Sequence, residues 1–207
     1  MKHDDESEET LRSQAEALGT GLTPEAEERL LEYEQLLRER GVGLGVVSKN
    51  DAPRLRWRHT LDSLRAVRTI RPRDTDAYDL GSGGGLPGVV IATALPRLEV
   101  TLVEARRRRA AFLELVIERL ELQNASVLAS RIQDLTRPVD VCFARALAPA
   151  AESWALAGRL LRPGGRLVYF AGDGVDRATA VPEGVQIEVR ETPVLESAGA
   201  LVIMTRQ

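Results

Sequence analysis

A glycine-rich turn between two apolar segments constrains this chain more than any other feature. Residues 78–80 end an apolar strand, residues 81–88 read Gly-Ser-Gly-Gly-Gly-Leu-Pro-Gly, and an apolar run follows at 89–92. Glycine tolerates positive φ and has no Cβ, so a ligand can lie against the backbone while amides at the start of the next helix point towards it. The pattern predicts a strand, a ligand-binding turn and a helix, with Pro87 in the first helical turn.

The spacing of these glycines separates two classes of ligand. A dinucleotide fingerprint requires G-x-G-x-x-G. If Gly81 and Gly83 are its first two glycines, the position of its third glycine is occupied by Leu86. The third glycine stands at Gly85 instead, which gives D-x-G-x-G-x-G starting from Asp79. This arrangement resembles the S-adenosylmethionine loop of class I methyltransferases, and Leu86 disfavours an NAD(P) enzyme. A tight turn without a ligand stays open as an alternative.

An acidic residue follows the loop at the separation expected of a ribose contact. Glu104 ends the apolar segment 99–104, about 20 residues after the loop, where an acid commonly binds a ribose diol. Four arginines, Arg106 to Arg109, come next. A site for the 2′-phosphate of NADP would use such arginines, but Glu104 would repel that phosphate. We therefore interpret them as the exposed opening turns of a helix.

From residue 76 onwards, strand-like segments alternate with helix-like ones. Strands are expected near 76–81, 99–104, 125–130, 139–144, 166–171, 185–192 and 200–205, and helices near 86–95, 106–121, 150–161 and, more weakly, 174–181. Gly164-Gly165 is expected to form the turn into the fifth strand. Alternation implies a parallel sheet with helices on both faces and a ligand outside the carboxyl ends of the strands. The predicted fold class is α/β, a Rossmann-like class I S-adenosylmethionine-dependent methyltransferase fold with a seven-stranded, mostly parallel sheet and an N-terminal helical appendage.

Helix signals fill the N-terminal third of the chain. Helices are expected over 7–18, 23–41 and 51–70, each with a recognisable start or stop residue. We divide the chain into an N-terminal helical region, 1–73, and a methyltransferase domain, 74–207.

The third of these helices carries arginines on one side. At about 100° per residue, four arginines fall within about 80° of one another, opposite a broad apolar arc: Arg54, Arg58, Arg65 and Arg68. The chain is otherwise acidic, with a net charge of −3, so we interpret this arginine stripe as a site for an RNA backbone. The alternative is a solvated face. His59 lies on the apolar side, where we expect a partly buried, hydrogen-bonded histidine at the junction of the two regions.

Composition disfavours several kinds of site. The single cysteine, Cys142, excludes an internal disulfide and stands in an apolar segment, where a small buried side chain is expected. The two histidines, His3 and His59, are far apart and there is no Cys/His cluster, so no metal is expected. No apolar run approaches the roughly 18 residues that span a membrane, and the acidic N-terminus is unlike a secretory signal. We expect a cytoplasmic protein with no membrane contact.

Further motifs carry a resemblance to a known family. The stretch Arg-His-Thr-Leu-Asp-Ser at 58–63, together with the loop at 79–88, resembles the RsmG (GidB) family of small-subunit ribosomal RNA guanine-N7 methyltransferases. Glu104, together with Arg-Arg-Ala-Ala-Phe-Leu at 108–113, resembles the acid and the K/R-R-x-x-F-L of that family. Two other stretches fall where the family has R-x-E-E and S-R-A-F: 130–134 and 144–146.

This resemblance, which covers about residues 25–175, implies S-adenosylmethionine as cofactor and ribosomal RNA or the small ribosomal subunit as partner. The cofactor contacts that we expect lie in the loop, at the ribose, around the adenine and at the end of the fourth strand: Gly81, Gly83, Gly85, Leu86, Glu104, Ile132, Gln133 and Arg145. On the RNA side, the family motif adds His59 to the four arginines of the stripe. The chain departs from the family at two places. Gln133 stands where the family has its second acidic residue, and Ala171-Gly172 stands where the family commonly has Lys-Gly.

The mechanism that the resemblance implies is in-line methyl transfer without a general base, because guanine N7 already presents a free lone pair. Catalysis would come mainly from positioning two bound reactants. We expect Arg145 to be catalytic, holding either the cofactor or the target nucleotide; a structural arginine that binds strand-end carbonyls is the alternative. A small-molecule methyltransferase of the same fold and a non-catalytic RNA-binding or assembly protein that retains the cofactor pocket also stay open. A monomer is expected.

Overall fold

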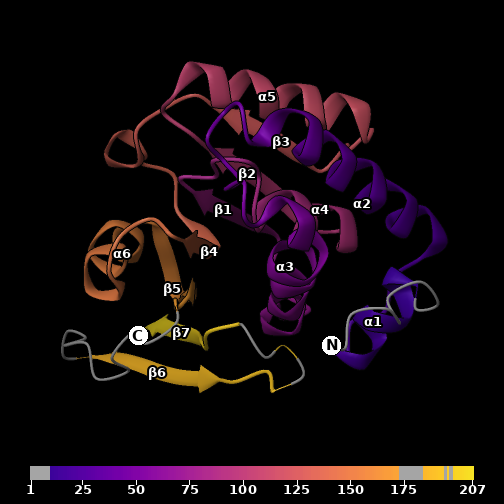
Figure 1. The fold of residues 1–207 in the computed structure, drawn as a ribbon. Helices are drawn as coiled ribbons and strands as arrows, with labels where there is room; N and C mark the ends of the chain where they lie inside the picture. The colour runs from indigo at the N-terminus through magenta and orange to yellow at the C-terminus, as the bar shows by residue number, and fades with distance from the viewer. Residues whose placement is uncertain (1–9, 173–183, 194, 196–197) are drawn as a thin grey trace.

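A seven-stranded sheet forms the centre of the protein (Figure 1). The computed structural model describes residues 10–172, 184–193, 195 and 198–207, so the weak helix predicted over 174–181 and the start of the first helix lie outside the described residues. Along the sheet the strands are ordered β3-β2-β1-β4-β5-β7-β6. The first five run parallel, and β7 is antiparallel to both of its neighbours. The predicted α/β architecture with a seven-stranded, mostly parallel sheet is confirmed.

The observed strand positions follow the predicted ones closely, with one exception. The strands are β1 Asp76–Leu80, β2 Glu99–Val103, β3 Ala125–Leu128, β4 Val139–Arg145, β5 Leu161–Phe170, β6 Val185–Arg190 and β7 Leu201–Arg206. Strand β5 begins before Gly164 and Gly165, so the prediction that this pair forms the turn into the strand was wrong. A Cβ at Gly165 would lie 2.9 Å from the carbonyl oxygen of Asp140 on β4, so glycine is needed for the close approach of two strands.

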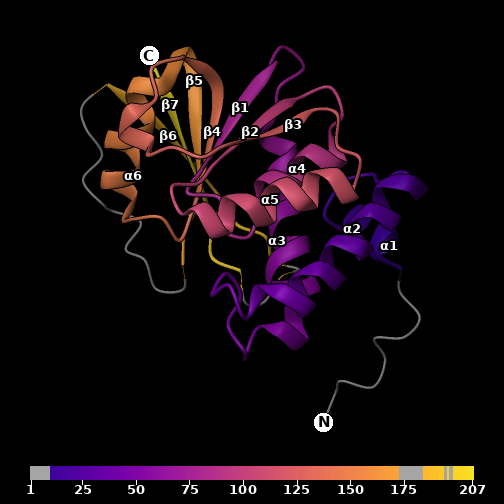
Figure 2. The same ribbon diagram turned by 90° about the horizontal axis from the view of Figure 1, so that it is seen from above.

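Helices cover both faces of the sheet, as predicted (Figure 2). Helices α4 (Gly88–Ala94) and α5 (Arg107–Arg119) lie on one face, and α6 (Ala150–Ala157) with the short turn η6 (Gly158–Leu160) lies on the other. Alternate residues of β4 divide between the two cores, because successive side chains of a strand point to opposite faces. Val141 and Phe143 join the cluster under α4 and α5, whereas Cys142 and Ala144 join the cluster under α6.

The N-terminal helices pack on the same face as α4. Helix α1 (Leu11–Ala17) and helix α2 (Pro24–Leu36) are each capped by a threonine side chain, and α2 continues into the π-helical turn η1 (Leu37–Gly41). Apolar residues of these helices belong to one buried cluster with those of α4 and α5. The division of the chain at residue 73 stays a prediction, but residues from both sides of it join the same buried cluster.

The segment predicted as one helix over 51–70 is a succession of different turns. It consists of η2 (Ala52–Arg54, 3₁₀), η3 (Arg56–Leu61, π), α3 (Asp62–Leu64, α) and η4 (Arg65–Thr69, 3₁₀). Each of these turn types rotates by a different angle per residue. The uniform rotation that defined the arginine stripe therefore does not hold along this segment.

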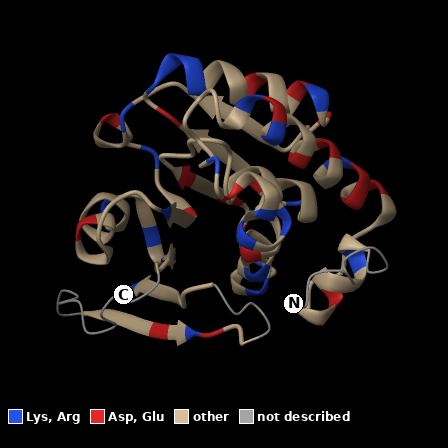
Figure 3. Cartoon of the chain, viewed as in Figure 1, with Lys and Arg blue, Asp and Glu red and all other residues tan. Residues whose placement is uncertain are grey.

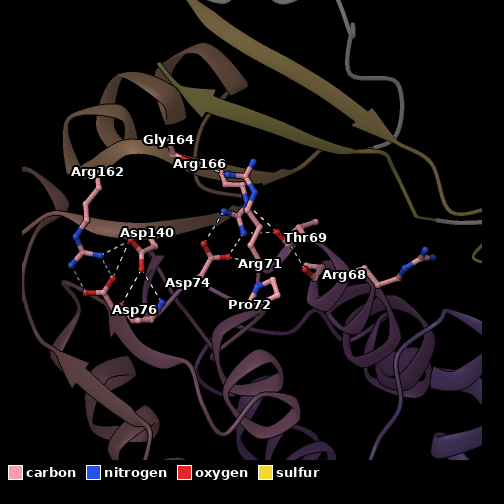
Figure 4. A network of polar contacts seen from close by, with 12 residues as sticks. Arg68, Thr69, Arg71, Pro72, Asp74, Asp76, Asp140, Arg162, Gly164 and Arg166 are labelled. Atoms are coloured by element: carbon pink, nitrogen blue, oxygen red, sulfur yellow. Dashed lines mark hydrogen bonds and ion pairs between the residues drawn. The ribbon is translucent and has the colours of Figure 1, made fainter.

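A buried polar network fixes the end of this segment to the sheet (Figure 4). Arg166 of β5, 1% exposed, donates to the carbonyl oxygen of Thr69 and to the carboxylate of Asp74. Beside it, Arg162 binds Asp76 and Asp140, the latter at 2.6 Å. These contacts lie where β1 and β4 begin, so η4 ends at the amino edge of the parallel strands, opposite the edge at which ligands bind in such folds.

Candidate functional site

The residues that end neighbouring strands meet at the carboxyl edge of the sheet. Leu80 pairs with Val103 on one side and with Ala144 on the other. The next residue along each strand is Gly81, Glu104 or Arg145, and the register therefore places all three side by side. Three of the regions that the sequence predicted to bind a cofactor are brought together by this register alone.

Glu104 is joined to the glycine loop through backbone amides. Its carboxylate accepts hydrogen bonds from Gly83 N at 3.0 Å and from Arg106 N at 2.8 Å, and the residue is 6% exposed. The amides of Gly81 and Ser82 both donate to the carbonyl oxygen of Val103. Carboxylate oxygens can accept more than one hydrogen bond each, so this arrangement fixes Glu104 while leaving it able to bind a ribose diol.

The glycines of the loop serve different purposes. Gly83 has φ +57°, and the nearest atom to a Cβ built there is Gly81 O at 3.8 Å, an ordinary van der Waals distance, so no described atom crowds this position. A Cβ at Gly85 would lie 2.5 Å from Val89, and one at Gly88 would lie 2.3 Å from Leu102. Gly85 and Gly88 are thus required for packing against the helix and strand, and Gly83 is the glycine that leaves room for a ligand. These residues fit a nucleoside cofactor lying on the loop beside Glu104.

The predicted adenine contacts follow the third strand. Ile132 and Gln133 belong to the 3₁₀ turn η5 (Ile132–Asp134), in which Ile132 is buried and Gln133 is exposed. Arg159 donates to the carbonyl oxygens of Ile132 at 2.6 Å and Leu135 at 2.7 Å, and so fixes the turn. Leu86 of the glycine loop is half-buried. A cofactor role for these residues stays a prediction.

Arg145 is held by residues of the N-terminal region. Its Nη2 donates to the carbonyl oxygen of Arg58 at 2.5 Å and to Nδ1 of His59 at 2.9 Å, and it lies 3.2 Å from a carboxylate oxygen of Asp62. Burial, and then the charge of Arg145, lower the pKa of His59 to about 4. A neutral His59 that accepts through Nδ1 is the tautomer that this contact requires. The expectation of a partly buried, hydrogen-bonded histidine at the junction is confirmed.

A cavity of about 390 Å³ opens beside Arg145, between the ends of β4 and β5 and the segment 52–69. Its walls include the aromatic residues Trp57, Tyr169 and Phe170. The polar wall consists of Arg58, Asp62 and Arg145. Aromatic and charged side chains that converge on a cavity next to a cofactor loop are suited to hold a planar, polar acceptor molecule.

The four arginines of the stripe do not share one exposed face, so this expectation was wrong. Arg65 is 4% exposed; it pairs with Asp62 at 2.7 Å and lies over the ring of Phe170. Arg58 is half-buried in the cavity wall, and Arg54 is exposed one turn before it. Arg68 is exposed but lies next to Thr69, in the network at the opposite edge of the sheet (Figure 4). Figure 3 shows basic residues on the segment 52–69 and at the start of α5.

Two residues to which the sequence analysis assigned no role support the loop. The hydroxyl of Tyr33, fully buried in α2, donates to the carbonyl oxygen of Gly84 at 2.8 Å. Asp79, the buried residue before the last of β1, accepts from Gly88 N at 3.1 Å. Its position before the first glycine of D-x-G-x-G-x-G was the available signal, whereas Tyr33 occupies an ordinary apolar position of a helix.

Replacing Asp79 with asparagine is expected to change how stability depends on pH. Burial raises the pKa of Asp79 from about 3.8 to about 7, so the folded protein holds this proton more tightly than the unfolded chain does. The stabilisation is fully present below pH 4 and is lost as the pH rises through 7, at about 1.4 kcal/mol for each pH unit between the two pKa values. Asparagine does not titrate. Urea unfolding from pH 4 to pH 8 should show the variant gaining stability relative to the unsubstituted protein as the pH rises. A constant difference would contradict this expectation.

In the residues that the structure describes, no helix has the length and apolar character to cross a membrane. Within the same residues, no three His, Cys, Asp or Glu side chains form a group that could hold a metal ion.

Comparisons with known proteins agree with this geometry. The family model described as GidB, rRNA small subunit methyltransferase G, matches residues 26–188. The chain is 42% identical to ribosomal RNA small subunit methyltransferase G of Acidiphilium cryptum (strain JF-5) over 164 residues, 77% of this chain and 75% of the relative. It is 36% identical to the protein of the same name from Ralstonia nicotianae, over 94% of this chain and 93% of the relative.

Solved structures confirm the fold at low sequence identity. An O-methyltransferase from Bacillus cereus in complex with SAH is similar with a TM-score of 0.58 and 15% identity, over 89% of this chain and 91% of that chain. A SAM-dependent methyltransferase from Aquifex aeolicus is similar with a TM-score of 0.57 and 16% identity, over 75% and 95% of the respective chains.

Proposed function

This chain belongs to the family of ribosomal RNA small subunit methyltransferase G, and we propose that it transfers the methyl group of S-adenosylmethionine to N7 of a guanine in small-subunit ribosomal RNA. The observation that carries the proposal is the meeting of the glycine loop, Glu104 and Arg145 at one edge of the sheet, beside a cavity with aromatic and charged walls. S-adenosylmethionine supplies an electrophilic methyl group when it is bound.

The residues divide into a cofactor side and an acceptor side. Gly83 leaves room for the cofactor, Glu104 would bind its ribose, and Ile132 and Gln133 would lie around its adenine. Arg145 stands between this side and the cavity, where it would orient the acceptor base. We propose that a monomer acts on the RNA or the small subunit in the cytoplasm, without a metal.

The chemistry of N7 is suited to a site of this kind. Guanine N7 presents its lone pair without losing a proton, so the protein has only to align two bound reactants. The ionisable groups next to the cavity are engaged in other contacts: Asp62 lies between Arg65 and Arg145, and His59 Nδ1 accepts from Arg145. Alignment can contribute roughly 7 to 11 kcal/mol to lowering the barrier.

Methyl transfer from labelled cofactor tests the proposal. The purified protein would be given small ribosomal subunits and naked small-subunit RNA from cells that lack its gene, and also large subunits and a metabolite extract. We expect label in small-subunit RNA, as 7-methylguanosine located by mass mapping. Label confined to the metabolites would indicate a small-molecule enzyme. Binding of S-adenosylhomocysteine without any transfer would indicate a non-catalytic protein.

The position of the exposed arginines predicts where RNA runs. Replacing Arg54 with glutamine is expected to weaken RNA binding. The slope of log affinity against log salt concentration should become shallower by about 0.7, the amount for one phosphate contact on a single strand. Arg68 is exposed on the same segment but lies beside the network at the amino edge. It is the matched control, since the same substitution there removes an equal charge far from the cavity. Equal salt slopes for the unsubstituted protein and the Arg54 variant would contradict an RNA path along this segment.

A further inference from the structure

The cavity beside Arg145 contains a donor and an acceptor side by side. Arg145 Nη2 and Asp62 Oδ2 are 3.2 Å apart, and both residues line the cavity. Asp62 is 7% exposed and Arg145 has a side chain 18% exposed, so the pair is largely withdrawn from water. In a nearly dry site, the order of donors and acceptors decides which polar molecule can bind.

Two atoms of this pair have unused hydrogen-bonding capacity. Arg145 Nη1 and Asp62 Oδ1 are buried and have no hydrogen-bond partner in the described part of the chain. Asp62 Oδ1 is ion-paired with Arg65 Nη2 at 2.7 Å, and a carboxylate oxygen can accept a further hydrogen bond. Buried polar atoms without partners are rare in native proteins, because leaving them unpaired is costly. A third such atom at this wall, Arg58 Nε, is ion-paired with Asp51, as Asp62 Oδ1 is with Arg65. Arg145 Nη1 next to the carboxylate of Asp62 points to a ligand that accepts from the first and donates to the second.

We propose that Arg145 and Asp62 read the Watson–Crick edge of the target guanine, an inference that rests on the proposed function. Arg145 donates to guanine O6, and the carboxylate of Asp62 accepts from N1–H and from the 2-amino group. Adenine presents a donor where guanine has O6 and an acceptor where guanine has N1–H, so the same pair of side chains would face it with like groups. N7 lies on the other side of O6 and is left free for methylation.

The aromatic walls suit the same ligand. Unstacked RNA bases are commonly held between aromatic side chains while polar groups bind their Watson–Crick edge. Trp57 is the half-buried aromatic residue of the cavity wall, whereas the buried ring of Phe170 lies under the guanidinium of Arg145, 5.9 Å from its ring centre, and supports that side chain. The cavity volume of about 390 Å³ lies within the range of small-molecule sites. The site therefore fits a purine base turned out of its stack.

A purely structural role for Asp62 would leave base preference unchanged. In that alternative, Asp62 neutralises Arg65 and Arg145 and never contacts the acceptor. Loss of activity in an Asp62 variant cannot separate the two roles, because both predict it. The preference among nucleotides can do so.

The test measures the binding of GMP, IMP and AMP to the full chain saturated with S-adenosylhomocysteine, by titration followed with NMR. IMP differs from GMP only in lacking the 2-amino group, so we expect it to bind roughly tenfold more weakly, the size of one hydrogen bond to a charged group. AMP should bind more weakly still. The Asp62→Asn variant should bind GMP roughly tenfold more weakly than the unsubstituted protein does. It should bind GMP and IMP with similar affinity. S-adenosylhomocysteine affinity should stay within about twofold, as expected for a residue outside its site.

Asp51→Asn is the matched control. Asp51 belongs to the same part of the chain and pairs with Arg58 at 2.9 Å, but it does not line the cavity. This variant should keep the preference for GMP over IMP.

Three outcomes would overturn the inference: equal binding of GMP and AMP by the unsubstituted protein, an intact preference in Asp62→Asn, or no binding of any of the three at millimolar concentration. Methylation of small subunits by the same preparation is measured in parallel. A preference for GMP without methyl transfer would overturn the proposed function and leave the reading of guanine standing. Methyl transfer without a preference for GMP would support the proposed function and overturn the inference that Arg145 and Asp62 read guanine.

Discussion

Replacing Glu104 with alanine is expected to weaken binding of the cofactor product S-adenosylhomocysteine at least tenfold. The carboxylate would lose two hydrogen bonds to the ribose, and bonds to a charged group contribute roughly 1.5 to 3 kcal/mol each. It also anchors the loop, since Gly83 N donates to it at 3.0 Å. Both effects act in the same direction. Isothermal titration with S-adenosylhomocysteine measures the loss, and urea unfolding shows whether the variant stays folded.

Two controls separate the ribose contact from a general effect on the loop. Glu99 stands at the other end of β2 and is exposed, so Glu99→Ala removes a carboxylate from the same strand without approaching the cofactor. A 2′-deoxy analogue of S-adenosylhomocysteine should bind the unsubstituted protein more weakly and lose little further affinity for the Glu104 variant. An effect below twofold on S-adenosylhomocysteine itself would show that Glu104 does not contact the ribose.

The cofactor half of the site could be predicted from sequence because its signals are local. The glycine spacing, the acid that ends β2 and the alternation of strands and helices are all properties of short stretches. Once alternation implies a parallel sheet, the ends of neighbouring strands must share an edge. Gly81, Glu104 and Arg145 are therefore placed together by a rule that needs no knowledge of side-chain packing.

The acceptor half could not be predicted in the same way because it depends on tertiary packing. A uniform helical rotation placed Arg65 with three other arginines, but the segment contains π and 3₁₀ turns and Arg65 is buried against Asp62 and Phe170. Asp62 was visible within the motif at 58–63, yet its partner Arg145 is more than 80 residues away in the sequence. No local pattern reports such a contact.

Contacts of the N-terminal region likewise could not be predicted from local sequence patterns. Tyr33 occupies a position with ordinary helical apolar spacing, and only the packing of α2 on the loop gives its hydroxyl a role at Gly84. The region predicted as an appendage supplies apolar residues to the common core and the residues that hold Arg145. Its removal would therefore remove one wall of the cavity.

Replacing Arg145 with alanine is expected to lower kcat/KM for small-subunit RNA by on the order of 100-fold or more. Truncation to alanine removes a charged donor from the cavity wall, and hydrogen bonds to a charged group contribute roughly 1.5 to 3 kcal/mol each, so the loss of one or two such bonds to the acceptor accounts for this factor. Asp62 would keep its ion pair with Arg65 at 2.7 Å. Lysine at this position would keep the charge but not the planar fork of donors, so Arg145→Lys should recover only part of the activity.

Measuring both kcat/KM for RNA and affinity for S-adenosylhomocysteine in the Arg145→Ala variant shows which of the two reactants Arg145 contacts. If Arg145 orients the acceptor base, kcat/KM for RNA falls while S-adenosylhomocysteine affinity holds; if it holds the cofactor, both fall together. We expect the first result, because Arg145 lines the cavity while Glu104 and Gly83 form the cofactor side. Arg119→Ala is the control, since among the described residues this exposed arginine makes a surface pair with Glu32, of the kind worth about 1 kcal/mol or less. Undiminished methyl transfer by a folded Arg145→Ala variant would leave Arg145 with a structural role alone, binding the carbonyl of Arg58 and joining the N-terminal region to β4.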